Sequence, residues 1–426
     1  MERNDPRYQA YVEILKEELI PAMGCTEPIA LAYAAAKARE VLGVLPDSVQ
    51  LQVSGSIIKN VKSVIVPNTG HLKGMEAAVA AGIIAGSAEK ELEVISEVSE
   101  EKKSAIRDYL QTVPITIEHT EQGHVFDIVV TERCGQDYAR VRIADYHTNI
   151  CRIEKNGTVL YEVPLLDETV QADARADRSL LNMQDIWDFA ETADLRDVAD
   201  LLERQIRYNN AIAEEGLLGD YGANIGRVLL TTYGNDVSNR AKAKAAAGSD
   251  ARMNGCELPV IINSGSGNQG ITCSVPLIEY AKELHSGKEK LYRALIISNL
   301  VAIHEKTGIG TLSAYCGAVS AGAGAGAGIV YLCGDGYQAA IHTVVNALAI
   351  VSGIVCDGAK ASCAAKIASS VDAALLGYNM YKCNQEFKGG DGIVMKDIET
   401  TIKGIGRLGK DGMKETNEEI IRLMIE

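Results

Sequence analysis

The distribution of strand and helix signals along the chain limits its fold most strongly. Residues 1–165 mix the two, with helices expected at 29–42 and 74–88 and two strands within 48–66. Five short strands are also expected, at 114–119, 125–132, 139–146, 150–154 and 158–163. From about residue 166 onward helical periods dominate. We therefore predict an α+β chain: a mixed α/β domain with an antiparallel sheet at 1–165, and a predominantly helical domain at 166–426.

The charge of the chain narrows the class of partner. The net charge is -15 and the pI about 5.1, with no cluster of Lys and Arg to offset the acidic background. This balance argues against nucleic acid and against an anionic membrane, so we expect a small soluble substrate. The charged first 20 residues do not resemble a signal peptide, which predicts a cytoplasmic protein. The apolar stretch 339–355 is shorter than the roughly 20 residues of a membrane span and predicts a buried helix.

Three of the ten cysteines lie in segments rich in Gly and Ala, and they are Cys316, Cys356 and Cys363. Three thiolates can hold an iron–sulfur cluster and leave one iron free for a substrate. On one continuous helix Cys356 and Cys363 would lie roughly 10 Å apart. We therefore expect a helix to begin near Asp357, with Cys356 in the preceding loop. Isolated cysteines are also common as buried apolar residues, so that alternative stays open.

A Gly-rich segment follows the strand-like residues 258–262. It consists of Ser264, Gly265, Ser266, Gly267 and Asn268. Its backbone amides and the Asn268 side chain are suited to hold a carboxylate or a phosphate, and a plain flexible turn is the alternative. The alternating Ala and Gly of 321–328 indicate close packing of backbones.

Two further segments contain candidates for proton transfer. His71 ends the sequence Pro-Asn-Thr-Gly-His and has the side chain best suited to proton transfer near neutral pH. Cys25 precedes a helix that starts near Pro28, and a helix N-terminus favours the thiolate form. A packing role is the alternative for both residues. His304 is a weaker third candidate.

Several motifs together resemble the L-cysteine desulfidase family and, more distantly, the iron–sulfur L-serine dehydratases. They are Gly24-Cys-Thr-Glu-Pro28, Ser54-Gly-Ser56, Pro67-Asn-Thr-Gly-His71, Ser264 to Gly270, Cys316-Gly317, and Cys356-Asp-Gly with Cys363. The resemblance covers essentially the whole chain. It implies a [4Fe-4S] cluster on Cys316, Cys356 and Cys363, with the fourth iron left for the substrate. It further implies Cys25 or His71 as the base, with Asn68, Thr69, Gly70 and residues Ser264 to Asn268 binding the substrate.

The implied reaction is β-elimination of L-cysteine to hydrogen sulfide, ammonia and pyruvate. One alternative is an iron–sulfur L-serine dehydratase. Another is a pyridoxal phosphate β-eliminase, with Lys59 forming the Schiff base and the Ser264 to Asn268 segment holding the phosphate. A third is a noncatalytic protein with a structural zinc. We expect a small amino acid as the binding partner and neither nucleic acid nor membrane, while assembly into a homo-oligomer stays open.

Overall fold

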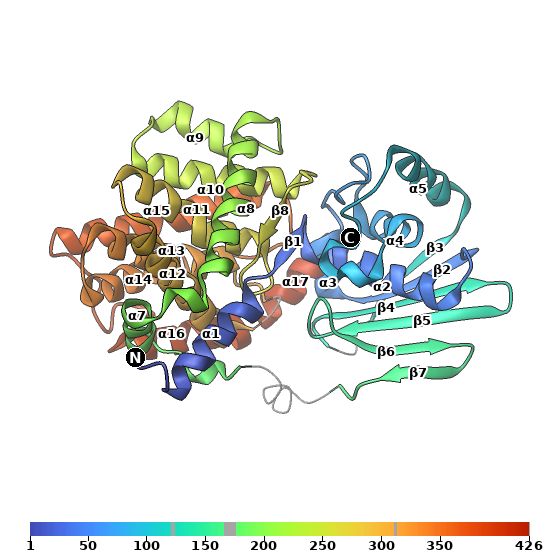
Figure 1. Ribbon diagram of the computed structural model, residues 1–426, viewed down its shortest axis with the longest axis horizontal. Helices are drawn as coiled ribbons and strands as arrows, with labels where there is room; N and C mark the ends of the chain where they lie inside the picture. The colour runs from blue at the N-terminus through green and yellow to red at the C-terminus, as the bar shows by residue number, and fades with distance from the viewer. Residues whose placement is uncertain (121–123, 166–175, 311–312, 426) are drawn as a thin grey trace.

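The computed structural model describes residues 1–120, 124–165, 176–310 and 313–425 (Figure 1). A helical part and a part built around a six-stranded sheet lie side by side. The strands are β1 Pro21–Met23, β2 Ser48–Ser54, β3 Ile115–Thr120, β4 Asp127–Cys134, β5 Asp137–Ala144, β6 Ile150–Lys155, β7 Thr158–Glu162 and β8 Pro259–Ile261. The α-helices of the first part of the chain are α1 Pro6–Glu18, α2 Thr26–Leu42, α3 Gly55–Val61, α4 Gly74–Ala85 and α5 Glu100–Thr112.

The rest of the described chain is almost entirely helical. Its α-helices are α7 Met183–Thr192, α8 Ala199–Leu218, α9 Ile225–Tyr233, α10 Val237–Met253, α11 Gly267–Glu283, α12 Lys288–Ile309, α13 Gly317–Cys333, α14 Tyr337–Val351, α15 Ser362–Lys382, α16 Ile398–Arg407 and α17 Lys414–Ile425. Short 3-10 segments lie at Ala88–Glu93, Arg178–Leu180 and Leu195–Asp197, and a π-helical turn at Leu408–Gly412. The predicted α+β class is confirmed.

The large sheet has the strand order β3-β2-β4-β5-β6-β7. All five predicted short strands are present, with ends shifted by one or two residues. The prediction of an antiparallel sheet is wrong for one pair, because β3 runs parallel to β2, with Val49 opposite Ile115. Helices α4 and α5 lie between these two strands in the chain and form the crossover that a parallel pair requires. The sheet is therefore mixed.

The second strand predicted within 48–66 is a helix instead. Strand β2 ends at Ser54, and α3 follows at once. Every residue of α3 is buried, including Ile57, Ile58 and Val61. A short helix buried on all sides has no solvent-exposed face, so its branched apolar residues cannot be told from those of a strand by periodicity.

Helix α2 covers one face of the sheet, where Val130, Val141 and Ile143 are buried. Helix α4 packs directly on α2, because a Cβ on Gly82 would lie only 2.2 Å from the carbonyl oxygen of Ala32. The N-terminus of α2 points toward the helical part, which places Cys25 at the junction of the two parts (Figure 1).

Helix α13 forms the centre of the helical part and contacts α11, α12, α14 and α15. Its alternating glycines face these neighbours. A Cβ on Gly324 would lie 2.4 Å from the Ser298 carbonyl oxygen of α12, and one on Gly326 would lie 2.8 Å from Ala374 of α15. The predicted close packing of 321–328 is confirmed. The apolar stretch 339–355 mostly forms α14, and no helix of the described ranges is both long enough and apolar enough to cross a bilayer.

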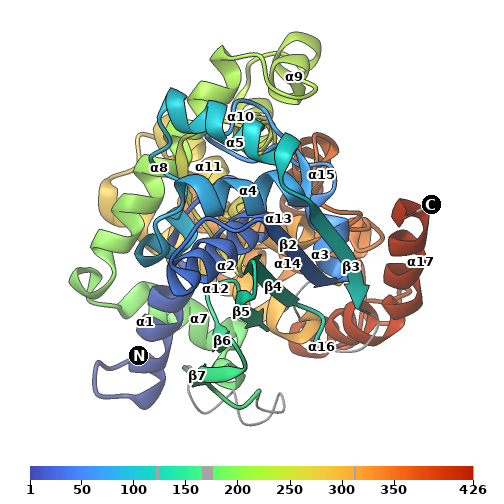
Figure 2. The same cartoon turned by 90° about the vertical axis from the view of Figure 1, so that its right-hand side faces the viewer.

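The two parts exchange segments. Helix α1 packs on the helical part, where the rings of Tyr8 and Tyr11 meet Phe189 edge-on at 5.1 and 5.3 Å. Strand β1 pairs with β8, and α17 lies against α3 (Figure 2). The predicted boundary at residue 165 adjoins residues 166–175, which lie outside the described ranges, and it stays a prediction.

Candidate functional site

Two of the three cysteines are joined through a short antiparallel bridge between Tyr315 and Val355. The Cys316 amide donates to the Ile354 carbonyl at 3.1 Å, and the Cys356 amide donates to the Ala314 carbonyl at 2.6 Å. Side chains alternate along extended backbone, so Cys316 and Cys356 lie on the same face of this bridge. Diagonal positions of this kind have Cβ atoms roughly 7 Å apart.

The third cysteine, Cys363, lies in the first turn of α15, and its Sγ is 3.5 Å from the Gly358 carbonyl oxygen. Cys356 lies in the preceding loop, as predicted, but the helix begins at Ser362 rather than near Asp357. The Asp357 carboxylate binds Lys360 at 2.6 Å and also Lys366, and does not cap the helix. Cys316 is itself the N-cap of α13. Two of the three sulfurs therefore lie at helix N-termini, where the positive end of the helix dipole favours negative charge.

Four cationic side chains interact electrostatically with these sulfurs: Lys59, Lys306, Lys366 and Arg252. Burial lowers the pKa of Lys306 to about 8, although the charges of Cys356 and Cys316 oppose this change. Burial lowers the pKa of Lys59 in the same way. Burial and the neighbouring Cys356 together raise the pKa of Cys316 to about 12.

The donor set fits an anionic iron–sulfur cluster. Three thiolates bring negative charge into a buried place, and the surrounding cations and helix N-termini offset that charge. Within the described ranges, no three His, Cys, Asp or Glu side chains converge tightly enough to hold one metal ion. A four-iron cluster spans several atoms itself, so its ligands need not meet at one point.

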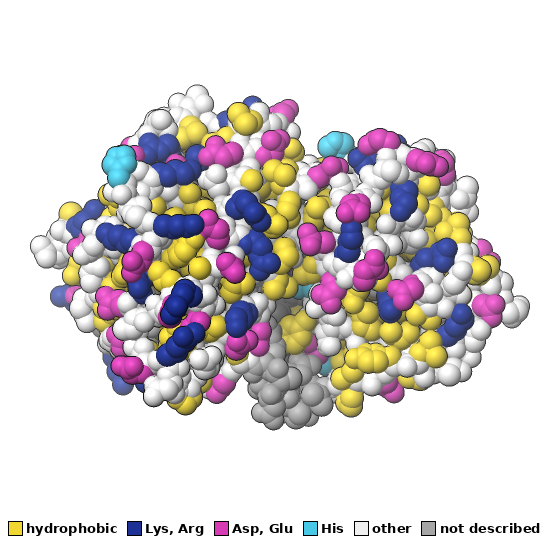
Figure 3. Space-filling view, viewed as in Figure 1, with side chains coloured by type: hydrophobic (Ala, Val, Ile, Leu, Met, Phe, Trp, Pro, Cys, Tyr) yellow, Lys and Arg dark blue, Asp and Glu magenta, His cyan; other side chains and the backbone are white. Residues whose placement is uncertain are grey.

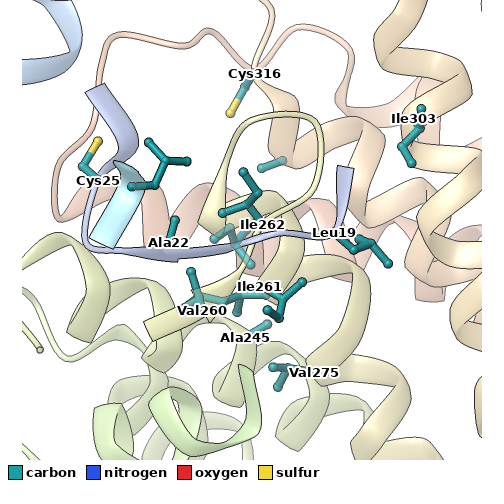
Figure 4. Packing of buried hydrophobic residues seen from close by; sticks show 14 of the residues in the cluster. Leu19, Ala22, Cys25, Ala245, Val260, Ile261, Ile262, Val275, Ile303 and Cys316 are labelled. Atoms are coloured by element: carbon teal, nitrogen blue, oxygen red, sulfur yellow. The ribbon is translucent and has the colours of Figure 1, made fainter. Parts of the chain in front are cut away.

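Cys25 is the N-cap of α2 and lies on the same side of the β1–β8 pair as Cys316 (Figure 4). Its Sγ lies 3.0 Å from Oε2 of Glu27. The expected thiolate character of Cys25 is wrong for the metal-free chain. Burial, reinforced by the Glu27 charge, raises the pKa of Cys25 well above its ordinary value, and the nearby Arg252 does not compensate.

Glu27 connects several groups at this junction. Its carboxylate accepts hydrogen bonds from Thr26 at 3.1 Å and Asn60 at 3.2 Å, and Nε2 of His147 lies 3.9 Å from it. Burial alone would raise the pKa of Glu27, but the interactions with His147 and Cys25 lower it to about 2. Glu27 is therefore a buried anion at neutral pH.

The Gly-rich segment joins β8 to α11 and meets Arg252 of α10. The Arg252 side chain is 2% exposed, and its Nη1 donates to Oδ1 of Asn268 at 3.1 Å. Its Nε has no hydrogen-bond partner, and Arg252 forms no ion pair with the residues that the structure describes. A Cβ on Gly267 would lie 2.2 Å from that Nε. Gly267 therefore makes room for a buried guanidinium.

Two other polar side chains lie against motif glycines in the same way. Gln269 is 5% exposed and its Oε1 lacks a partner, while a Cβ on Gly317 would lie 2.6 Å from its side chain. Nε2 of His147 also lacks a hydrogen-bond partner, and a Cβ on Gly265 would lie 3.3 Å from its ring. Three motif glycines thus adjoin three buried polar groups that other described residues leave unsatisfied.

The buried polar side chains of the Pro67–His71 turn bind the backbone around them. Asn68 donates to the Ile95 carbonyl at 2.8 Å, and Thr69 donates to the Val66 carbonyl at 2.7 Å. Gly70 and His71 are exposed, and Nδ1 of His71 lies 3.6 Å from the position of a Cβ on Gly255. The roles of these residues stay predictions.

The turn nevertheless adjoins the site, because Pro67 packs on Gly24, where a Cβ would lie 2.7 Å from the proline ring. His304, the weaker candidate, lies 2.8 Å from the Glu399 carboxylate of α16.

Sequence reasoning missed several polar residues of this junction. They are Glu27, Asn60, His147, Arg252 and Gln269, and Lys59 was considered only as a Schiff-base lysine. Glu27 and Gln269 fall inside motifs that the sequence shows, so those motifs were a usable signal. Arg252 ends an Ala-rich helix and His147 lies in a turn after β5, and neither position has a local pattern that marks it.

Comparison with known proteins identifies the family. Residues 89–422 match the family model of the serine dehydratase alpha chain. The chain belongs to this family. The family is one of iron–sulfur serine dehydratases, so the broader part of the predicted resemblance is confirmed. The match includes Arg252, the Gly-rich segment and all three cysteines, and it begins after Cys25, Glu27 and Lys59.

Relatives align along the whole chain. A UPF0597 protein of Desulfitobacterium hafniense is 62% identical, covering 100% of this chain and 98% of the relative. UPF0597 proteins of Lachnoclostridium phytofermentans and Treponema denticola are 53% and 47% identical. The first of these covers 98% of this chain and 100% of the relative, and the second covers 100% of both. These UPF0597 relatives thus align with essentially the full length of this chain.

Proposed function

We propose that this protein is a lyase that splits L-cysteine into hydrogen sulfide, ammonia and pyruvate. One observation carries the proposal: the Tyr315–Val355 bridge brings Cys316 and Cys356 together, and their charges interact with Cys363 at a partly buried place near several cations. Membership of the serine dehydratase alpha chain family supports elimination at the β-carbon of a small amino acid.

Cys316, Cys356 and Cys363 would hold the [4Fe-4S] cluster. When bound, the cluster supplies a Lewis acid at its fourth iron, which stabilises the leaving group. Lys59, Lys306 and Lys366 would offset the negative charge of the three thiolates at this partly buried place.

The elimination breaks the Cα–H bond and the Cβ–S bond and forms an enamine. The enamine then tautomerises and hydrolyses with one water to pyruvate and ammonia. The base has to receive the α-proton. Cys25 is better placed for this task than His71, because Cys25 is buried on the same side of the β1–β8 pair as Cys316 whereas His71 is exposed. The Cys25 thiol donates to the Glu27 carboxylate at 3.0 Å, and Cys25 would have to lose this proton before it could accept the α-proton.

L-serine is a second candidate substrate, and the family description favours it. The two reactions differ only in the leaving group, and soft sulfur suits an iron site. The pyridoxal alternative would use Lys59. The Lys59 Nζ donates to Oδ1 of Asn417 at 2.6 Å, and its charge interacts with the nearby cysteines. These contacts suit a buried cation that pairs with the sulfurs better than a Schiff-base lysine.

The decisive experiment uses protein purified without oxygen. Sulfide and pyruvate release from L-cysteine and L-serine would be measured together with iron and acid-labile sulfide content. We expect Cys316→Ala to lose iron and to lower turnover by about 100-fold or more, since even residues outside the ligand set cost 10–100-fold at metal sites.

Cys333→Ala is the matched control, because Cys333 is an exposed free cysteine at the other end of the same helix. Full turnover in Cys316→Ala contradicts the proposal. A pyridoxal absorption band trapped by borohydride would favour the pyridoxal alternative, and zinc without iron would favour the structural-zinc alternative.

A further inference from the structure

Arg252 is a buried charge of the site that forms no ion pair with the described residues. Its side chain is 2% exposed, yet it donates a hydrogen bond only to the neutral amide of Asn268 among those residues. Its charge interacts with Cys25, Glu27 and Cys363, but none of these forms an ion pair with it. Burying a guanidinium without an ion-pair partner costs free energy. A bound anion would offset this cost.

The unpartnered edge of the Arg252 guanidinium indicates which class of anion it can bind. With Nη1 engaged by Asn268, the unpartnered Nε is left to donate. The planar fork of Arg matches a carboxylate with two parallel hydrogen bonds, which Lys cannot reproduce. Gly267 lets the guanidinium lie directly on the loop backbone and thereby fixes its orientation.

A second unsatisfied group lies on the same loop and has the opposite polarity. Oε1 of Gln269 is buried without a partner and can accept a hydrogen bond from an ammonium group. Gln269 packs on Gly317, directly after the cysteine Cys316. A donor for a carboxylate and an acceptor for an ammonium thus lie between Cys25 and the cysteine trio.

We propose that Arg252 binds the α-carboxylate of the amino-acid substrate and that Gln269 accepts from its α-ammonium group. This assignment replaces the loop amides, Asn68 and Thr69 as the main carboxylate contacts. The assignment of Arg252 and Gln269 depends on the proposed function in one respect, which is the choice of an amino acid as the ligand.

Binding of two unreactive probes tests the assignment. L-alanine has the carboxylate and ammonium but no β-leaving group, and ethylamine lacks the carboxylate. Calorimetric titration of the cluster-loaded protein, kept anaerobic, should show binding of L-alanine and none of ethylamine. We expect Arg252→Met to weaken L-alanine binding by about 10–100-fold and Arg252→Lys to restore only part of that loss.

Arg39→Met is the matched control, because Arg39 also has a buried Nε without a partner, near the opposite end of α2 from Cys25. Iron content and the thermal midpoint are measured for each variant. Unchanged L-alanine affinity in a folded Arg252→Met protein overturns the assignment, and so does equal binding of both probes or of neither. Loss of iron in Arg252→Met also overturns it, in favour of Arg252 as a partner of the cluster through Cys363.

The proposed function fails separately. If the wild-type protein binds L-alanine through Arg252 but releases neither sulfide nor pyruvate from L-cysteine and L-serine, the reaction is wrong and the carboxylate contact stands.

Discussion

Glu132 of β4 shows what a buried charge does in this chain away from the site. It is fully buried, and neither carboxylate oxygen has a hydrogen-bond partner among the described residues. Burial raises the pKa of Glu132 well above its ordinary value, with only Arg39 opposing this change. Glu132 therefore takes up a proton on folding, unlike Glu27, whose partners keep it ionised.

The consequence is a pH-dependent cost in stability. Because the folded pKa lies above the unfolded value of about 4.3, the free energy of unfolding falls as pH rises above that value. We expect Glu132→Gln to lie close to the wild type at about pH 4 and to exceed its free energy of unfolding by about 1–3 kcal/mol at about pH 8. Urea unfolding at the two pH values measures this. The exposed Glu289→Gln should show no such pH-dependent difference; an equal gain there would contradict the explanation.

At the residue scale the sequence predicted the groups that belong to compact motifs. Cys316, Cys356 and Cys363 could be proposed because three thiols in Gly-rich segments suit a cluster. Arg252 could not, because its candidate role depends on a buried Nε that has no hydrogen-bond partner among the described residues, and only the packed structure shows this. The motif glycines were visible, but their task of making room for buried polar side chains was not.

At the scale of single elements, α13 depends on its glycines for contact with four neighbouring helices. A Cβ on Gly324 would lie 2.4 Å from a backbone oxygen of α12, which cannot move without shifting that helix. We expect Gly324→Ala to lower the free energy of unfolding by about 1–3 kcal/mol despite the better helix propensity of Ala. Thermal or urea unfolding measures this change.

Gly336→Ala is the control for the α13 substitution, because nothing lies within 4 Å of a Cβ at that position and its φ is -91°. A change within about 0.5 kcal/mol is expected there. If Gly324→Ala proved as harmless as Gly336→Ala, tight helix contact would not be the reason for the alternating sequence.

Element prediction succeeded for the five short strands, whose β-branched runs are separated by turn residues. Helix α3 is buried throughout and was misread as a strand. The parallel pairing of β3 with β2 follows from how α4 and α5 pack, which no local pattern encodes.

At the scale of the whole molecule, α17 ties the helical part to the α/β part. Oδ1 of Asn417 accepts from Nζ of the buried Lys59, and the Ile421 side chain lies 3.0 Å from the position of a Cβ on Gly55. The attachment of α17 therefore depends on the hydrogen bond of one buried lysine. On the face shown in Figure 3, acidic and basic side chains are interspersed over both parts.

Removing that attachment should affect stability and activity together. We expect Asn417→Ala to cost about 1–3 kcal/mol in the free energy of unfolding, because the Lys59 ammonium loses its partner in a buried place. Turnover should fall as well, since Lys59 faces the cysteines. Urea unfolding and the anaerobic assay measure the two effects. Glu419→Ala on the exposed side of α17 should change neither; similar losses there would show that α17 acts only as a whole.

The sequence predicted two parts but not their exchange of segments. Helix α1 and strand β1 belong to the first part by their position in the sequence, but they pack on the second part. Their partners, Phe189 and β8, are remote in the chain, so no local pattern predicts these contacts.

The wide separation of the site residues along the chain has a consequence for biosynthesis. Glu27 and Lys59 leave the ribosome early, Arg252 much later, and Cys316, Cys356, Cys363 and Asn417 after all of these. A nascent polypeptide that ends before Cys363 has an incomplete set of thiols. If these three cysteines hold the proposed cluster, iron has to be delivered after most of the polypeptide has been translated, and a product truncated before Cys363 would lack one ligand.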